Sequence, residues 1–408
     1  MILDELAMGL VSIILRKKQE LINSGKTNAE AEEIANELSS KLIPLYIKLD
    51  SESYDEKLTI TNCKNILKLM PDDIDVLSRK YSLTCESEDA FLKKLLALQS
   101  KYEPEFLKRN NIDGDIFQIE EKNLYEDYGN RDFIRLLSQI AHLYFIIGET
   151  ESSLKYNELV EKIAPALFNQ ISFQLSLSYL ALNNEGALKK LLNKYPDQRR
   201  IKLASSFASY FNDHDFTKLI KNLNSFNKFL PVALGDGFSV SDDIFAQCLQ
   251  ENEYQLGSAV EALRIMVDLA SIRKGEFLKE IQSSFTGNPL VPNIFDVINE
   301  KNLLLFHYFI AINNGKSVPT FTYNDLKKIC LKDSKDTSEI QEETKQFEKF
   351  ESEKELKKAF DYLKSLGFFF KVNKGEYMTD LTFDIVFETI VEIVNQVQDD
   401  EADSFKTC

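Results

Sequence analysis

The segment from Arg109 to Glu120 holds the arrangement of potential metal ligands that comes nearest to a known site. Asn111, Asp113 and Glu120 fall at positions 3, 5 and 12 of a twelve-residue calcium-binding loop, and Gly114 falls at its sixth position. The first position of such a loop must supply a carboxylate oxygen, but this chain has Arg109 there, whose charge repels Ca²⁺. The segment is therefore predicted to be a loop between helices, and no metal site is expected.

Nucleophilic catalysis has no local signature in the chain. A serine or cysteine nucleophile needs a histidine base within hydrogen-bond reach. His142, His214 and His307 lie 72 and 93 residues apart, with no motif residues beside them. The stretch from Gly235 to Ser239 matches neither a phosphate-binding loop nor a nucleophile elbow, and it is predicted to be a turn between helices. The sequence thus favours a protein that is not an enzyme and binds no cofactor.

The composition predicts an ordered protein with little attraction for polyanions. Apolar residues make up 44% of the 408 positions, enough to build a core. The formal charge of −16 opposes non-specific binding to nucleic acid or anionic lipid, because both need a cationic surface. The expected partner is a neutral or basic protein or peptide, with nucleic acid and membranes disfavoured and the oligomeric state left open.

The cysteines and the first residues indicate a cytoplasmic protein. The five cysteines lie far apart and form no C-x-x-C pair, which predicts reduced thiols rather than a zinc site. The apolar run from Leu6 to Leu15 follows acidic residues and precedes Arg16, the reverse of the charge order in a secretory signal, so a buried helix is expected there. No stretch reaches the roughly 18 uncharged apolar residues that a membrane span needs.

The elements that must position any functional residues are almost all helices. Apolar residues recur at three- and four-residue spacing, and only nine prolines and 14 glycines interrupt them. The predicted order is helices at 1–70, a helical repeat array at 71–315, a smaller module at 316–398 and an acidic tail at 399–408. Within the array, breaks between helices are expected at Pro231 and around Gly287.

Two segments of the array, 71–104 and 134–196, repeat one pattern of large, small and aromatic positions. The first begins at Pro71 and closes at Pro104, 33 positions later. Its two helices would carry, in order, Ile74, Leu77, Ser78, Tyr81, Ala90 and Ala97. The second segment would carry Leu137, Ala141, Tyr144, Gly148, Ser153 and Pro165, followed by a weaker unit with Ser176 and Tyr179. Small residues let paired helices approach closely, and Gly148 permits a left-handed turn between them.

These segments resemble tetratricopeptide repeats, a family of right-handed helical-hairpin solenoids whose concave face grips peptides. The resemblance covers about a quarter of the chain. It implies an all-α, solenoid fold and a partner-binding groove. Five residues occupy groove positions in that frame: Arg135, Ser138, His142, Gln170 and Phe173.

The end of the chain is predicted to differ from the array. A charged segment at 332–355 precedes a helix from Leu356 to Leu366 and a β-hairpin over residues 368–379. With a helix at 323–331 and a closing helix at 383–397, this order resembles a winged-helix module. Residues 316–408 hold 14 Lys, no Arg and 20 acidic residues, so protein contact is favoured over DNA binding.

The leading hypothesis is a non-catalytic scaffold or adaptor that cradles a partner segment in the groove. A helical array followed by a winged helix also resembles the layout of the PCI-type subunits of the proteasome lid. The alternative is a peptide-responsive transcriptional regulator, although residues 1–50 offer no convincing helix-turn-helix, or a winged-helix factor associated with nucleic acid. An enzyme is the least favoured class, because no local motif brings acids and bases together.

Overall fold

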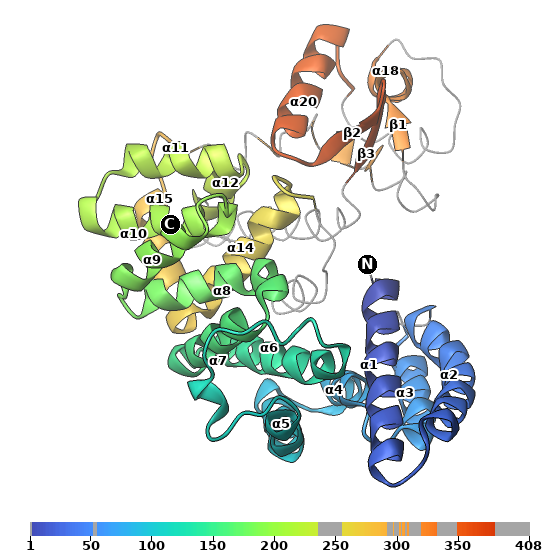
Figure 1. The fold of residues 1–408 in the computed structure, drawn as a ribbon. Coiled ribbons are helices and arrows are strands. Elements are labelled where there is room, and N and C mark those ends of the chain that lie inside the picture. Colours follow the sequence, from blue (N-terminus) through green and yellow to red (C-terminus); the bar gives the residue numbers. More distant parts are fainter. Residues whose placement is uncertain are drawn as a thin grey trace. The chain divides into compact units, whose positions relative to one another are not determined.

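The computed structural model describes residues 2–51, 55–235, 255–291, 320–332 and 349–379, together with 297, 302, 304–306, 308 and 309. These residues are mostly helical, with a small three-stranded sheet toward the C-terminal end (Figure 1). The chain divides into two compact units, residues 1–201 and 202–408. The predicted mainly helical fold with a small C-terminal hairpin is confirmed at this level.

Unit 1 is built from helices alone among its described residues. Its α-helices are α1 (Ile2–Asn23), α2 (Asn28–Ser51), α3 (Glu56–Leu69), α4 (Ile74–Thr84), α5 (Glu88–Arg109), α6 (Arg131–Ile146), α7 (Thr150–Ile163), α8 (Phe168–Ala181) and α9 (Glu185–Lys194). Three short 3₁₀ helices join them: η1 (Ile116–Gln118), η2 (Tyr128–Asn130) and η3 (Pro165–Leu167). The helix α10 (Arg199–Asp213) spans the boundary between the units.

Unit 2 combines further helices with the sheet. Its helical elements after α10 are α11 (Phe216–Phe226), α12 (Leu230–Gly235), α14 (Ala259–Ser271), η4 (Ile272–Gly275) and α15 (Glu276–Phe285). The elements that follow are β1 (Thr320–Thr322), α18 (Tyr323–Cys330), α20 (Glu353–Ser365), β2 (Phe369–Asn373) and β3 (Glu376–Thr379).

Short polar side chains begin many of these helices. An N-cap oxygen accepts a hydrogen bond from a backbone N–H that the first turn leaves unpaired. Residues that do this are Asp55, Asp73, Ser87, Asn184, Asp215, Ser258, Thr322 and Ser352. At α18 the pairing is reciprocal, since Asp325 also accepts from the backbone N–H of Thr322. Local sequence therefore sets where these helices start.

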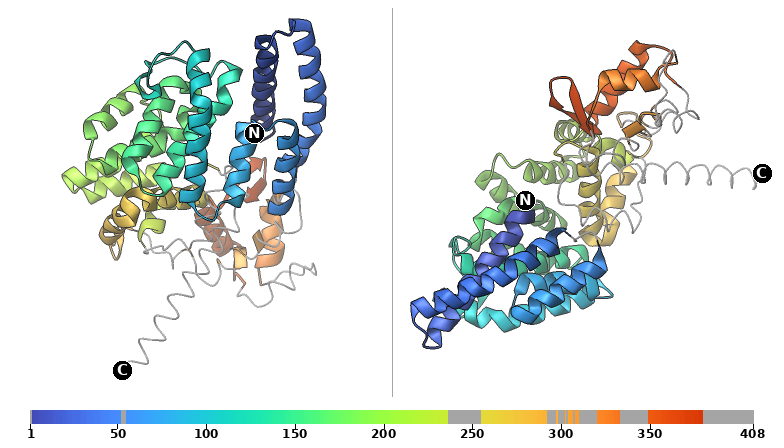
Figure 2. Two further views of the ribbon diagram at one scale, coloured as in Figure 1. Left: turned by 90° about the horizontal axis from the view of Figure 1, so that it is seen from below. Right: turned by 90° about the vertical axis from the view of Figure 1, so that its right-hand side faces the viewer.

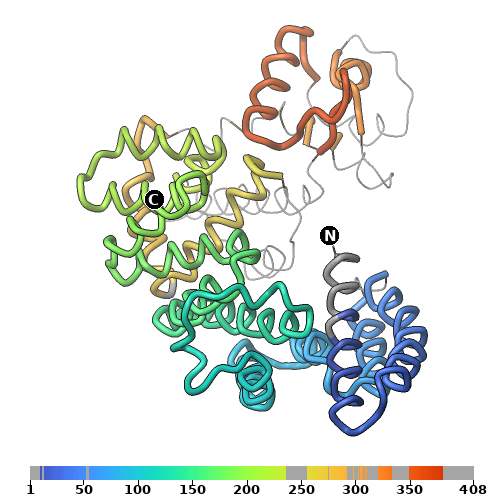
Figure 3. The backbone as a smooth tube through the Cα atoms, viewed as in Figure 1, coloured from blue at the N-terminus to red at the C-terminus, as the bar shows by residue number. Residues whose placement is uncertain are grey.

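Consecutive helices of unit 1 pack on one another. Each helix from α1 to α9 contacts the next, and α6 also contacts α4 and α8, so these three lie in a row (Figure 3). Side chains from α1, α2, α3 and α4 share one apolar cluster that includes Ile13, Leu42, Ile66 and Val76. The turn between α1 and α2 lies at the periphery of unit 1 in both views of Figure 2.

The α6–α7 hairpin contains several of the residues that define the second predicted segment. Ser153 is fully buried on α7, and its hydroxyl donates a hydrogen bond of 3.0 Å to the carbonyl of Ala141 on α6. Gly148 has a φ of +81° in the turn between the two helices. Tyr144 lies against Tyr156, with ring centroids 5.6 Å apart. The small and glycine positions therefore act as the sequence pattern predicted.

The first segment departs from its predicted boundaries. Pro104 does not close a repeat but lies inside α5, which continues to Arg109. Ala97 is exposed, whereas Leu92, Leu95 and Leu98 on the same helix are buried. The reason is that α5 faces its neighbours with its leucines, so the small residue is on the solvent side.

The described part of the C-terminal module has the strand order β1-β3-β2, with β3 antiparallel to both neighbours. Phe360 on α20 packs on Phe369 and Tyr377 of the hairpin, with ring centroids 4.6 and 5.0 Å apart. Phe368 is buried as well and contacts Phe229 and Phe306. These aromatic side chains pack beneath the hairpin, as predicted, and continue into the helical part of unit 2.

Other boundaries in unit 2 also differ from prediction. Pro231 lies in the first turn of α12 instead of ending a helix, a position that tolerates proline because no N–H bond is lost there. The strand β1 was not predicted, since three residues are too few to show an alternating pattern. Most of the charged segment, the closing helix at 383–397 and the acidic tail at 399–408 lie outside the described residues.

We expect the close approach of Gly367 to be essential to unit 2. Gly367 has a φ of +80°, and a Cβ there would lie 2.3 Å from the Gly257 carbonyl oxygen and 2.5 Å from the Ser258 Cα. Both are backbone atoms, so Gly367→Ala should destabilise unit 2 by at least about 3 kcal/mol in urea unfolding followed by circular dichroism.

Gly375→Ala is the matched control. Gly375 has the same φ of +80° but no atom within 4 Å of an added Cβ, so only the strain of about 1 kcal/mol applies. Equal losses in the two variants would show that backbone strain, and not the contact with Gly257, explains the role of Gly367.

Candidate functional site

The predicted groove residues lie on two neighbouring helices of unit 1. Arg135, Ser138 and His142 are on α6 at spacings of three and four residues, which places them on one side of that helix. Gln170 and Phe173 are on α8, which contacts α6. The structure therefore brings the two groups onto adjacent elements.

Arg135 is engaged within the protein. Its Nε donates to Asp75 Oδ1 at 3.1 Å, and its Nη2 donates to Asp75 Oδ2, which ties α6 to α4 through a two-point ion pair. Burial alone would lower the pKa of the Arg135 guanidinium, but the charge of Asp75 and its hydrogen bonds outweigh burial and raise that pKa. This arginine holds two helices together in the described structure.

The other four predicted residues divide by exposure. Phe173 is 1% exposed, so its ring belongs to the core. His142 is half-buried, and its Nδ1 lies 2.5 Å from Nε2 of Gln174 on α8. Ser138 is half-buried and Gln170 is exposed. A ligand on this face would therefore meet a small polar surface.

A second buried ion pair, which the sequence did not single out, joins α1 to α6. Arg16 Nη1 donates to Asp132 Oδ2 at 2.9 Å, and the two side chains are 5% and 4% exposed. Arg16 also donates to the backbone oxygen of Asp72 at 2.6 Å. The sequence signals for this ion pair were weak: Arg16 directly follows the apolar run from Leu6 to Leu15, and Asp132 stands beside apolar residues of α6.

The two buried cysteines of the described chain, Cys63 and Cys330, lack the features of an activated nucleophile. Burial raises the pKa of the Cys63 thiol to about 11 and that of Cys330 to about 12, the opposite of what an activated nucleophile requires. His214 is exposed at the turn between α10 and α11, and His307 lies outside the described residues. Within the described part of the chain, no three or more His, Cys, Asp or Glu side chains are arranged so that they could hold a metal ion.

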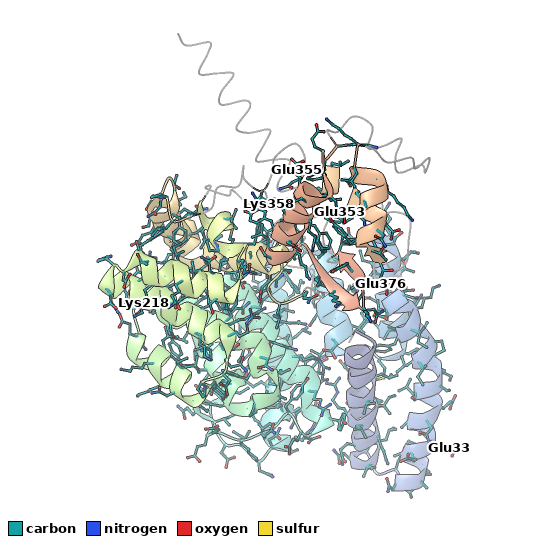
Figure 4. All side chains as sticks on the ribbon, turned by 90° about the horizontal axis from the view of Figure 1, so that it is seen from above. Glu33, Lys218, Glu353, Glu355, Lys358 and Glu376 are labelled. Atoms are coloured by element: carbon teal, nitrogen blue, oxygen red, sulfur yellow. The ribbon has the colours of Figure 1, made fainter. Side chains whose placement is uncertain are left out.

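The hollow between α10 and α11 is small. It encloses about 180 Å³ when open solvent is counted, and its lining includes Ser206, Tyr210, Asp213 and Lys218. Figure 4 shows Lys218 at the surface. This hollow is therefore a surface depression with polar walls.

Apolar side chains are exposed mainly on the first three helices. Eleven large apolar side chains are exposed among the described residues, and six of them lie on α1, α2 and α3. These six lie two on each helix and are together named here the N-terminal apolar face: Val11, Leu15, Ile43, Ile47, Leu58 and Leu69. Ile47 is 55% exposed, and the neighbouring Pro44 is exposed as well. Single exposed apolar residues are ordinary, whereas a contiguous apolar patch marks a contact surface.

The chain has no match among protein-family models, curated proteins or solved structures. None of the described helices combines the length and the apolar character that crossing a bilayer requires.

We expect Arg135→Ala to destabilise unit 1 by about 2 kcal/mol, because it leaves Asp75 partly buried without its cation. Ser138→Ala, one turn away, should stay within about 0.5 kcal/mol of the parent protein. Urea unfolding of both variants measures the difference. A neutral Arg135→Ala would mean that this side chain is free to serve a ligand.

Proposed function

We propose that this protein is a non-catalytic interaction scaffold that holds a partner protein, with the N-terminal apolar face as a principal contact surface. The observation that carries the proposal is the concentration of exposed apolar side chains on α1, α2 and α3. Covering apolar surface yields roughly 25 cal/mol per Å², so such a face is where a partner gains most.

Charges beside this face favour a basic partner. Glu30, Glu32, Glu33 and Glu37 are all exposed on α2, and Figure 4 shows Glu33 projecting from that helix. Glu32 and Glu37 already pair with Lys18 and Lys41, whereas Glu33 has no partner among the described residues. A basic side chain on the partner would find a carboxylate at this end of α2.

The row of α4, α6 and α8 supports a second part of the proposal. In a right-handed tetratricopeptide-like solenoid, the first helices of successive hairpins lie side by side and line the concave face. The contacts of α6 with α4 and with α8 fit that arrangement. Ser138 and Gln170 would then contribute polar contacts, while Arg135 and Phe173 would support them from within.

The test is quantitative affinity capture from native extract, read by mass spectrometry. Replacing Ile43 and Ile47 by Glu places two charges on the N-terminal apolar face, and the set of retained proteins should fall at least about tenfold, a loss of 1.4 kcal/mol. The matched control replaces Leu182 and Leu256 by Glu, since both are exposed but lie outside α1, α2 and α3. Circular dichroism verifies that all forms are folded.

Two outcomes of this capture would count against the proposal. If the control loses the same proteins, general surface charge and not the N-terminal apolar face decides binding. If no protein is retained by the parent form above background, the scaffold proposal fails.

A second candidate function, nucleic-acid association of the winged-helix-like module, draws on a charge separation. The described residues of the module, 320–332 and 349–379, hold ten Lys and six acidic residues, a balance of +4. Lys354, Lys358, Lys371 and Lys374 are exposed and have no ion-pair partner among the described residues, and Figure 4 shows Lys358 projecting from α20. The acidic excess of residues 316–408 therefore comes from segments outside the described part.

Fluorescence anisotropy with labelled duplex DNA at rising salt tests this second candidate. If all four lysines contact phosphates, log Kd should change with log salt by roughly 3 to 4, and replacing all four by Ala should abolish that dependence. The control replaces the exposed Lys26, Lys57, Lys64 and Lys93 in unit 1. Absence of binding at low salt would remove this candidate.

A further inference from the structure

Five charged side chains gather where α1, α4 and α6 meet. The carboxylates are Asp73, Asp75 and Asp132, and the guanidiniums are Arg16 and Arg135. Asp73 is 2% exposed and Asp132 is 3% exposed. Two of the carboxylates are matched by an arginine each, Asp132 by Arg16 and Asp75 by Arg135. The cluster thus holds one carboxylate more than it holds cations.

Asp73 is the carboxylate without a cation. It is the N-cap of α4, and its Oδ1 accepts the Val76 N–H at 3.1 Å. Its Oδ2 accepts the phenolic hydrogen of Tyr46 from α2. No Lys or Arg of the described chain forms an ion pair with it. Two neutral donors compensate a buried negative charge only in part.

The remaining groups around Asp73 do not supply the missing charge. The Cys63 thiol on α3 is buried, and burial raises its pKa, so it carries no charge. The charge of Arg79 on α4 lowers this pKa, and the charge of Asp73 raises it. Asp72, the preceding residue, is bound by Lys101 and Tyr102 of α5. Asp75 and Asp132 add negative charge from α4 and α6. Arg16 is close enough to feel Asp73, but it is bound to Asp132.

We propose that Asp73 retains a proton in the folded protein and that this proton allows the start of α4 to pack beneath α2 beside the carboxylates of Asp75 and Asp132. When the proton is lost, the ionised carboxylate is repelled by Asp75 and Asp132 in a site that water does not reach. The α1–α2 hairpin then loosens from α4. The hairpin is therefore a pH-sensitive element of unit 1, closed below neutrality and loosened above it.

The direction of titration agrees with this geometry. Burial, followed by the charge of Asp75, raises the pKa of Asp73 to about 7 from its usual value of 3.8. The folded state therefore binds this proton more tightly than the unfolded state does. The contribution to stability is fully present below the unfolded value, declines as the pH rises toward about 7, and stays constant above it.

The experiment compares the full chain with Asp73→Asn. The amide oxygen can still accept from Val76, and the amide nitrogen can donate to the Tyr46 oxygen, so the variant imitates the protonated acid. At about pH 5.5 the parent protein should release about one proton more than the variant when it unfolds. Between about pH 5 and 6 the unfolding constant of the parent should rise relative to the variant by about tenfold. The control is Asp72→Asn, at an exposed aspartate paired with Lys101. Because the pKa of Asp72 is lowered, this variant should release as many protons on unfolding at about pH 5.5 as the parent does.

Limited proteolysis supplies the structural readout. At about pH 8.5, α1 and α2 should be cleaved faster in the parent than in Asp73→Asn, and at about pH 5.5 the two rates should agree. Equal proton release and equal cleavage at both pH values would overturn the proposal.

Tyr46→Phe keeps the proposal testable if Asp73→Asn does not fold. Removing the donor to the ionised form raises the affinity of Asp73 for its proton, so the pH at which the hairpin loosens should move upward. An unchanged or lower transition pH in Tyr46→Phe would contradict the proposed role of Asp73.

Discussion

The ion pair between Arg16 and Asp132 is the contact on which the arrangement of unit 1 depends. It joins residues 116 positions apart with both side chains buried. Removing one member of such a pair leaves an uncompensated charge and typically destabilises a protein by about 3–5 kcal/mol, far more than an exposed pair. Because Asp132 lies on α6, the ion pair fixes the position of α1 relative to the row of α4, α6 and α8.

The position of α1 explains why the first three helices carry exposed apolar side chains. The inner faces of these helices pack in the shared cluster of Ile13, Leu42 and Ile66. The buried ion pair between Arg16 and Asp132 fixes α1 on that side. Val11 and Ile47 are then left on the outer side, where no described element covers them. The ionic contact thus orients the surface that we propose binds a partner, and the proposed proton on Asp73 would adjust how firmly that surface is held.

Helical periodicity, with the prolines and glycines that interrupt it, was sufficient to predict a mainly helical fold, since these signals act within a few residues. The Ser153 and Ala141 contact was also predictable, because small residues at fixed spacing are local signals of close helix packing. The ion pair of Arg135, in contrast, could not be predicted from local sequence. The position of this residue in the repeat frame suggested a ligand contact, but its partner, Asp75, lies 60 residues earlier. Pairing across that separation depends on tertiary packing, which periodicity does not encode.

Other differences have the same origin. Pro104 was predicted to close a repeat, yet α5 continues beyond it to Arg109, because the burial of its leucines offsets the cost of a proline inside the helix. The strand β1 exists because β3 offers it a partner, and its three residues have too little pattern of their own. The N-terminal apolar face was equally hidden, because α1, α2 and α3 have apolar residues on both sides and only the packed structure shows which side is covered.

The most direct measurement of the central claim is hydrogen exchange of the full chain with and without a protein recovered by affinity capture. We predict slower exchange on binding in α1, α2 and α3, together with the row of α4, α6 and α8. Protection confined to unit 2, with exchange in the first three helices unchanged, would contradict it.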